Sequence, residues 1–396
     1  MTAEPFDPNA PLPGPPDPWA YAPTPSWRDG PPYHLTDMIA AEPALARRII
    51  ARLAPDRATG ELARAIRSAA AGHAPIVVTG CGTSETAGQG IVEILREAVR
   101  SAGQSEAVVI AEQAFELALD PPARGLVIGV SHEGGTGATN GALRASRAAG
   151  ARTTIVTVSG RAPAGEVADI VIETGELDQS WCHSIGYVSP LVAGAVVAAR
   201  VTGRPLDGDA VAALLAAGAI DESGAERVAG QLGSAAHLLV VASGADRPAG
   251  RELTLKVEEA SWLPSAYRDL ETFLHGHLPA TGPNSGLVLI LADRAGREER
   301  LARAKQALAA AKVIGLRAAA ILAEALDSQL DPELTPAGRL LVGDDTNMPA
   351  PVAALLGTAT PLQLLTERIA RARGTNPDLI RREDEAYRRA AEAAGG

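Results

Sequence analysis

Short apolar runs alternate with helical patterns along most of this chain. Where a β-branched run precedes apolar positions spaced three and four residues apart, the pattern predicts a strand followed by a helix, the repeating unit of a parallel sheet. In the first half we expect strands at 75–79, 106–111, 125–131, 153–158 and 170–173. Helical patterns at 84–101, 135–149 and 185–201 separate several of them. This half therefore predicts a doubly wound α/β unit.

The same alternation restarts in the second half. Strands are expected at 238–242, 287–291, 318–322 and 340–342, and helices at 248–263, 296–314 and 351–373. Further helices are expected at 35–54 and 59–71, and two more between 207 and 233. The predicted fold is an α/β protein with two doubly wound parallel sheets, each a three-layer α/β/α subdomain.

A chain of 396 residues is too long for one ordinary core, which agrees with two domains and short appendages. We expect a proline-rich arm at 1–33, N-terminal helices at 34–74, a first sheet domain at 75–205, a helical connection at 206–235, a second sheet domain at 236–375 and a tail at 376–396. Dense prolines exclude helix and sheet pairing in the arm. It is either a disordered tail or an arm that packs its aromatic residues on a neighbouring subunit.

Composition narrows the class of partner. The formal charge of −11 offers no basic surface for a phosphate backbone, which argues against nucleic-acid binding and favours small metabolites. The two cysteines, Cys81 and Cys182, form no CxxC pair and no metal-ligand spacing, so we expect no metal and no cofactor. We also expect no signal peptide and no membrane span, and a cytoplasmic location.

Two stretches rich in glycine and hydroxyl residues follow predicted strands of the first half. They are Cys81-Gly82-Thr83-Ser84 and Ser131-His132-Glu133-Gly134-Gly135-Thr136. In an open parallel sheet, ligands bind beyond the carboxyl ends of the strands, where glycines admit the ligand and helix N-termini favour anions. A hydroxyl at such a position, taken alone, is more often a helix cap than a ligand contact. Two such clusters in one sheet favour a shared anion or sugar site.

A second group of chemical side chains opens the second half. Glu252, Lys256 and Glu259 stand at i, i+4 and i+7, so they share one face of a helix, and His275 follows in a Phe-Leu-His-Gly stretch. A solvated ion-pair stripe would have the same spacing. A carboxylate and a histidine are also the pair that can move protons on a sugar.

Taken together, these ordered motifs resemble the double sugar isomerase (SIS) family, in particular the isomerase domain of glucosamine-6-phosphate synthase. The resemblance covers roughly 35–380 and rests on the motifs at 81–84 and 131–136, on Glu252, Lys256, Glu259 and His275, and on the stretches 361–365 and 373–375. It implies two flavodoxin-like subdomains and a homodimer.

The resemblance also implies roles. The first-half loops would hold a sugar phosphate through Ser84, Ser131 and Thr136, with Cys81, Gly82, Thr83 and His132 beside them. Glu259 would be the base that shuttles a proton between C1 and C2, and Lys256 and Glu252 would orient the open chain. His275 would help to open the ring, often from the neighbouring subunit.

The sequence departs from the family in three places. The first is Glu385, which stands where the synthase has an imine-forming lysine. Separately, we do not expect the glutamine-hydrolysing domain of the synthase here. Glu133 replaces a serine of the phosphate loop, and at about 4 Å two like charges repel by roughly 4 kcal/mol at an effective dielectric near 20. Either Glu133 points away from the phosphate, or the ligand brings an amino group to pair with it.

The third departure is the segment 176–184, where His183 and Cys182 could line the site or merely form a helix N-terminal turn. Our interpretation is an isomerase or deaminase of a phosphorylated sugar or amino sugar. The alternative is a non-catalytic regulatory protein that binds a sugar phosphate.

Overall fold

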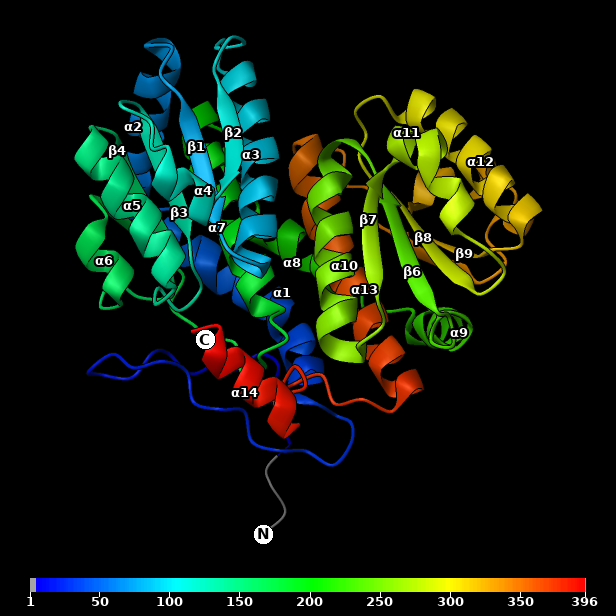
Figure 1. Cartoon of the computed structure of the whole chain (residues 1–396). Coiled ribbons are helices and arrows are strands. Elements are labelled where there is room, and N and C mark those ends of the chain that lie inside the picture. Colours follow the sequence, from blue (N-terminus) through cyan, green and yellow to red (C-terminus); the bar gives the residue numbers. More distant parts are fainter. Residues whose placement is uncertain (1–4, 396) are drawn as a thin grey trace.

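Two parallel five-stranded sheets form the framework of the protein (Figure 1). The computed structural model describes residues 5–395. The first sheet contains β1 (Ile76–Gly80), β2 (Val109–Gln113), β3 (Leu126–Val130), β4 (Arg152–Thr157) and β5 (Ile170–Glu173). The second contains β6 (His237–Ala242), β7 (Ser265–Asp269), β8 (Ser285–Leu291), β9 (Arg317–Ala323) and β10 (Gly338–Val342).

The two sheets share one topology. Their strand orders are β2-β1-β3-β4-β5 and β7-β6-β8-β9-β10, so each sheet has its first strand second from the edge. The central pairs β1/β3 and β6/β8 are both parallel, with Val77 opposite Val127 and Leu239 opposite Leu287. The predicted α/β fold with two doubly wound sheets is therefore confirmed.

Helices cover both faces of each sheet (Figure 1). In the first half they are α1 (His34–Leu53), α2 (Arg57–Ala71), α3 (Thr83–Ser101), α4 (Ala114–Leu119), α5 (Gly137–Ala149), α6 (Pro163–Val167) and α7 (Ile185–Thr202). In the second half they are α8 (Gly208–Ala217), α9 (Glu222–Leu232), α10 (Arg247–Ser261), α11 (Leu270–Thr272), α12 (Arg297–Ile314), α13 (Ala350–Arg373) and α14 (Glu385–Ala393).

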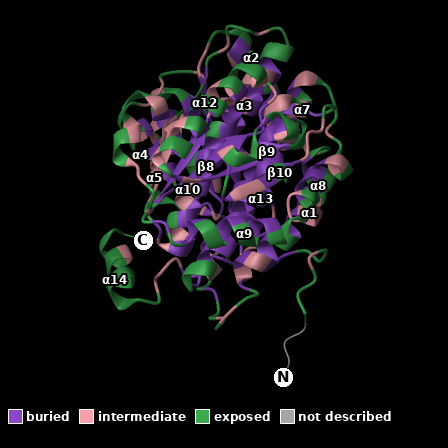
Figure 2. Ribbon diagram, turned by 90° about the vertical axis from the view of Figure 1, so that its right-hand side faces the viewer, coloured by how far each residue is buried: buried purple, intermediate pink, exposed green. Residues whose placement is uncertain are grey.

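One continuous core joins the two halves, where α3 and α7 meet α10 and α13 (Figures 1 and 2). Among the described residues, α7 is the one helix long and apolar enough to span a membrane by length and composition. It is 83% buried inside the protein, which identifies it as a core helix. This packing brings the first turn of α3 close to α10.

Strand β7 is not among the strands predicted from the sequence, and β2 lies two to three residues later in the chain than predicted. Both are edge strands. The five residues of β7 are only half-buried and include Arg268 and Asp269, so no apolar run marks the strand. Position in the sheet, rather than local pattern, determines these two strands.

The proline-rich arm lies along its own chain. Leu12 is buried, its N–H donates to the Glu176 carboxylate at 2.8 Å, and the Pro13 carbonyl accepts from the Leu177 N–H at 2.9 Å. Further along, Arg161 donates to the Pro15 carbonyl. From residue 5 onward the arm thus packs on its own chain and is not a free tail, while Tyr21 and Trp27 remain exposed.

Candidate functional site

A cavity of about 680 Å³ lies at the carboxyl ends of β1 and β3. The predicted residues that line it are Cys81, Gly82, Thr83, Ser84, His132, Glu133, Thr136, His183 and Glu259. The structure therefore brings both glycine and hydroxyl loops together with the carboxylate of α10. Ser131 lies directly behind them, where its hydroxyl donates to Thr136 Oγ1 at 3.2 Å.

The first loop turns the chain from β1 into α3. Gly82 has φ +56°, a left-handed conformation that a side chain would strain, and it forms the N-cap of α3. No side chain caps this helix, and the N–H groups of Ser84 and Glu85 donate to the carbonyls of Cys81 and Gly82 within the turn itself. Such an N-terminus suits an anion.

The second loop turns β3 into α5, whose N-cap is Thr136, again without a side-chain cap bond. Asn140 fixes the loop by donating to the Gly134 carbonyl at 3.2 Å. Two helices therefore begin at the same cavity. Their positive ends add up at one place, and this is the arrangement in which a phosphate is best stabilised.

Glu252, Lys256 and Glu259 share one face of α10, but that face is buried rather than solvated. Lys256 Nζ lies 2.6 Å from Glu259 Oε2 and 3.8 Å from Glu252 Oε1. Burial alone would lower the pKa of Lys256, and the two carboxylates outweigh it and raise that pKa. Glu252 is fully buried, and Thr86 donates to it from α3. Glu259, 23% exposed, is the member of the group that reaches the cavity.

Glu133 is engaged by the arm. Its Oε2 accepts the Ala22 N–H at 3.0 Å, and the Tyr21 hydroxyl donates to the Gly135 carbonyl at 3.2 Å. A Cβ at Gly135 would collide with the Tyr21 ring, so the close approach of the arm requires glycine there. Tyr21 and Ala22 also line the cavity. A serine at position 133 could not make the same bond to the arm.

Two histidines and one carboxylate meet behind the second loop. The Asp178 N–H donates to Nε2 of buried His132 at 2.9 Å, so that nitrogen carries no proton. Burial and the neighbouring His183 lower the pKa of His132 to about 4. The rings of His132 and His183 lie 5.5 Å apart between centroids. His132 is therefore a neutral, buried residue at the inner wall of the cavity.

We expect the neutrality of His132 to appear in the pH dependence of stability. An unfolded imidazole takes up a proton near pH 6.5, whereas the native ring resists protonation until about pH 4. The stabilising contribution is thus complete above pH 6.5 and is lost as the pH falls towards 4, by about 3 kcal/mol. In urea denaturation at several pH values, wild type should lose about this much more stability than His132→Gln.

The matched control for this measurement is His73→Asn, at an exposed position. Because this variant keeps His132, it should lose about as much stability as wild type when the pH falls from 6.5 towards 4. Equal pH profiles for wild type and His132→Gln would contradict the assignment of a neutral buried ring.

No model of a known protein family matches the sequence, and no curated protein matches it. Solved structures do match. The C-terminal domain of glucosamine-fructose-6-phosphate aminotransferase from Francisella tularensis is 18% identical, with a TM-score of 0.74 over 89% of this chain and 99% of that one. A provisionally named phosphosugar isomerase from Silicibacter pomeroyi is also 18% identical, with a TM-score of 0.70 over 87% and 100%.

The glucosamine-6-phosphate deaminase from Thermotoga maritima is 17% identical, with a TM-score of 0.56 over 77% of this chain and 87% of that one. The chain has the double-SIS fold. The resemblance inferred from the motifs is thereby confirmed at the level of architecture.

Within this double-SIS fold, His275 does not join the cavity of its own chain. It lies beside α11, which Figure 1 places at the opposite end of the molecule from α14. Its side chain is 69% exposed, and its Nε2 contacts Glu271 at 2.7 Å. Glu271 is in turn paired with Arg303. The acid–base pair of Glu259 and His275 is therefore not assembled within one chain.

The C-terminal tail closes the cavity on another side. Ile380 and Arg382 line it, and the Arg382 guanidinium lies 5.0 Å from the Trp181 ring centroid. Glu385, exposed at the start of α14, is not one of the lining residues. Sequence reasoning missed Tyr21, Ala22 and Arg382, because nothing local in a proline-rich arm or a polar tail indicates where it folds back.

The loops of the second sheet carry an ion pair at the corresponding place. After β8, Arg300 pairs with buried Asp293 at 2.6 Å. Asp293 also accepts the Ala245 N–H at 3.0 Å. The positive charge that a ligand phosphate would seek is thus already neutralised there.

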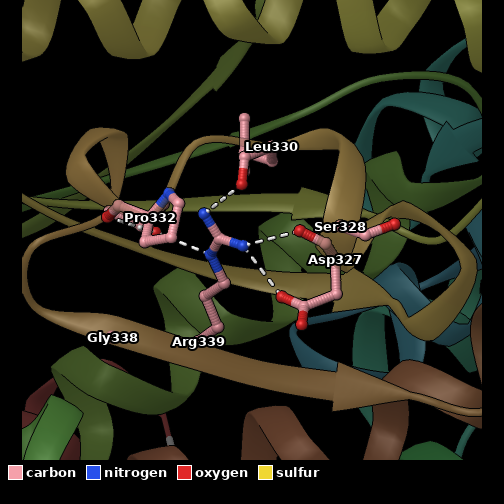
Figure 3. Close-up of a pocket in the computed structure, with 7 residues that line it drawn as sticks. Asp327, Ser328, Leu330, Pro332, Gly338 and Arg339 are labelled. Carbon is pink, nitrogen blue, oxygen red and sulfur yellow. Dashed lines mark hydrogen bonds and ion pairs between the residues drawn. The ribbon is translucent and has the colours of Figure 1, made fainter.

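A separate hollow of about 460 Å³ lies near the end of the second sheet (Figure 3). Arg339 projects into it and donates to the Asp327 carboxylate and carbonyl and to the Leu330 carbonyl, at 2.7 to 2.9 Å. Its Nε donates to Thr335 at 2.8 Å. Because the guanidinium donates to these groups of the protein, Arg339 stabilises the loop before β10.

Proposed function

We propose that this protein is an isomerase or deaminase of a phosphorylated sugar or amino sugar. The observation that supports the proposal most strongly is the meeting of two uncapped helix N-termini with the Glu259 carboxylate in one cavity. The two helix N-termini provide an anion site for a phosphate, and the Glu259 carboxylate provides a base. The fold, shared with sugar-phosphate enzymes, supports the same class.

In the proposed reaction, the phosphate binds at Ser84, Ser131 and Thr136. Glu259 removes the proton from C2 of an open-chain aldose, which leaves an enediolate with its negative charge on O1. The proton of the C2 hydroxyl then passes to O1, and Glu259 returns its proton to C1 to give the ketose. Lys256, 2.6 Å from Glu259, orients this carboxylate. With an amino group at C2, the same proton shift gives an imine at C2, and water then releases ammonia.

The direct test is hydrogen exchange at carbon. Hexose 6-phosphates and 2-amino-hexose 6-phosphates are incubated with the protein in heavy water, and deuterium at C1 and C2 is followed by NMR. We expect incorporation with at least one of them. Tight binding without any exchange would instead favour a sugar-phosphate-binding regulatory protein and would overturn the proposal.

Glu133 leads to a prediction about the substrate. Its carboxylate lies at the cavity rim, bonded to the arm through one oxygen. We propose that it favours a substrate ammonium group. Glu133→Gln keeps an acceptor for Ala22 and removes the charge, so the preference for glucosamine 6-phosphate over glucose 6-phosphate should fall by about tenfold, roughly the 1.4 kcal/mol of a screened charge pair.

Titration calorimetry with both sugar phosphates measures this ratio directly. The matched control is Glu258→Gln on exposed α10 surface, which should leave the ratio unchanged. An unchanged ratio in Glu133→Gln would show that the carboxylate serves the arm alone.

A further inference from the structure

An imidazole with a buried carboxylate behind it faces the cavity, and the proposed proton shuttle leaves it unused. His183 lines the cavity together with Glu259, and its side chain is 27% exposed. Its Nδ1 is buried and has no hydrogen-bond partner within residues 5–395. The nearest acidic atom to Nδ1 is Asp178 Oδ2 at 3.6 Å, slightly beyond hydrogen-bond length.

Asp178 is fixed in place by the backbone. Its Oδ1 accepts the Ser180 N–H at 3.0 Å, and its Oδ2 accepts the N–H groups of Ser184 and Gly186 at 2.8 and 3.2 Å. These are the residues that lead into α7, so the carboxylate caps that helix. Because the position of Asp178 is fixed, the ring of His183 is presented with one nitrogen towards a permanent negative charge. This arrangement is the one that orients a general acid–base imidazole.

We propose that His183, oriented by Asp178, is the acid–base residue that opens the sugar ring within the same chain. The inference rests on the proposed function of the cavity. It assigns to His183 the step that the resemblance assigned to His275, which lies elsewhere in this chain. Asp178 is a positioning residue and does not touch the substrate.

The imidazolium of His183 donates its proton to the ring oxygen O5 while the C1–O5 bond breaks. The electron pair of the C1 hydroxyl O–H bond forms the C1 carbonyl, and its proton passes to water. His183 is left neutral and regains a proton from solvent, and Glu259 remains an unprotonated base for C2.

The charges around His183 support a protonated ring. Burial by itself would lower the pKa of His183, but the Asp178 carboxylate, with a smaller contribution from Glu259, raises it. Lys256 acts in the opposite direction, and the nearby ring of His132 is neutral. A histidine so placed keeps its proton to a higher pH than burial alone would allow, and it can release that proton to a sugar oxygen.

The test separates ring opening from carbon chemistry. The α and β anomers of glucose 6-phosphate and of glucosamine 6-phosphate interconvert only through the open chain, so NMR exchange spectroscopy measures ring opening, and deuterium at C2 measures proton abstraction. We expect His183→Gln to reduce the protein-catalysed anomer exchange by about 10²-fold. Glu259→Gln should keep anomer exchange and lose deuterium incorporation, and the exposed-site variant His73→Asn should keep both.

Two further variants sharpen the result. Asp178→Asn should lower the pKa of His183, so the fall of anomer exchange with rising pH should begin at a lower pH than in wild type. If His275→Gln loses anomer exchange and His183→Gln does not, ring opening is carried out by His275 and the inference is wrong. The inference is also wrong if His183→Gln and Glu259→Gln lose anomer exchange and deuterium incorporation to the same extent.

The outcomes distinguish the two proposals. Deuterium exchange by wild type without any acceleration of anomer exchange would overturn the role of His183 and leave the isomerase intact. The absence of both activities would overturn both proposals.

Discussion

Glu259→Gln is expected to reduce deuterium exchange at C1 and C2 by about 10³-fold. A general base contributes on the order of 10² to 10⁴ to rate, and glutamine keeps the shape of the side chain while losing the ability to accept a proton. Glu259 is the member of the α10 group that reaches the cavity, whereas Glu252 and Lys256 are buried behind it. Among the described residues that line the cavity, the carboxylates are Glu133 and Glu259, and of these two Glu259 is the one paired with Lys256.

Binding should survive this change. The phosphate is expected to bind at the two loops and helix N-termini, so the dissociation constant of a sugar phosphate should change by less than about fivefold. The control variant is Glu258→Gln, one residue away on the exposed side of α10, which should exchange deuterium like wild type. Wild-type exchange rates in Glu259→Gln would remove Glu259 from the mechanism.

Lys256→Met is expected to destabilise the protein by about 3 to 5 kcal/mol at pH 7. Removing one partner of a buried ion pair leaves the other charge uncompensated. Here the group left behind is Glu252, which is fully buried and is then left with the hydroxyl groups of Thr86 and Thr83. Urea denaturation of the variant and of wild type measures the difference.

The loss should shrink as the pH falls. Burial raises the pKa of Glu252 even with Lys256 present, and without the lysine the neutral carboxylic acid is favoured further. A raised native pKa makes the folded state take up a proton before the unfolded state, so the variant gains stability relative to wild type as the pH falls from 7 towards the ordinary pKa of glutamate. Lys305→Met, on exposed α12 surface, should show neither effect. If the stability lost in Lys256→Met did not depend on pH, the loss would come from packing and not from the charge of Glu252.

Much of the fold is contained in local patterns. Buried strands such as β1 and β3 are continuous apolar runs, and their helices carry regular apolar positions, so both sheets could be predicted. The edge strand β7 could not, since half-buried positions in a parallel edge carry no such run. Its existence depends on the hydrogen bonds that β6 offers to any extended neighbour.

The candidate site also has parts that local sequence patterns predict and parts that they do not. The loops at Ser84 and Thr136 were found because glycines and hydroxyls at strand ends are a local signal for ligand contact. The relation between His183 and Asp178 was not found, because five residues of separation in a loop do not determine which way either side chain faces. Whether the stripe on α10 was solvated or buried also depended on α3, whose Thr86 contacts Glu252.

The arm and the tail together set the order in which this site can be built. Tyr21 and Ala22 come from the start of the described chain, whereas Ile380 and Arg382 come from near its end, and all four line one cavity. The ribosome synthesises the chain from its amino end. Both loops are therefore made long before Glu259, and Glu259 is made long before Ile380 and Arg382, the last residues that line the cavity. The cavity reaches its final shape only after Arg382 has left the ribosome, so a nascent chain halted within α13 carries both proposed binding loops and the proposed base but has an unfinished pocket.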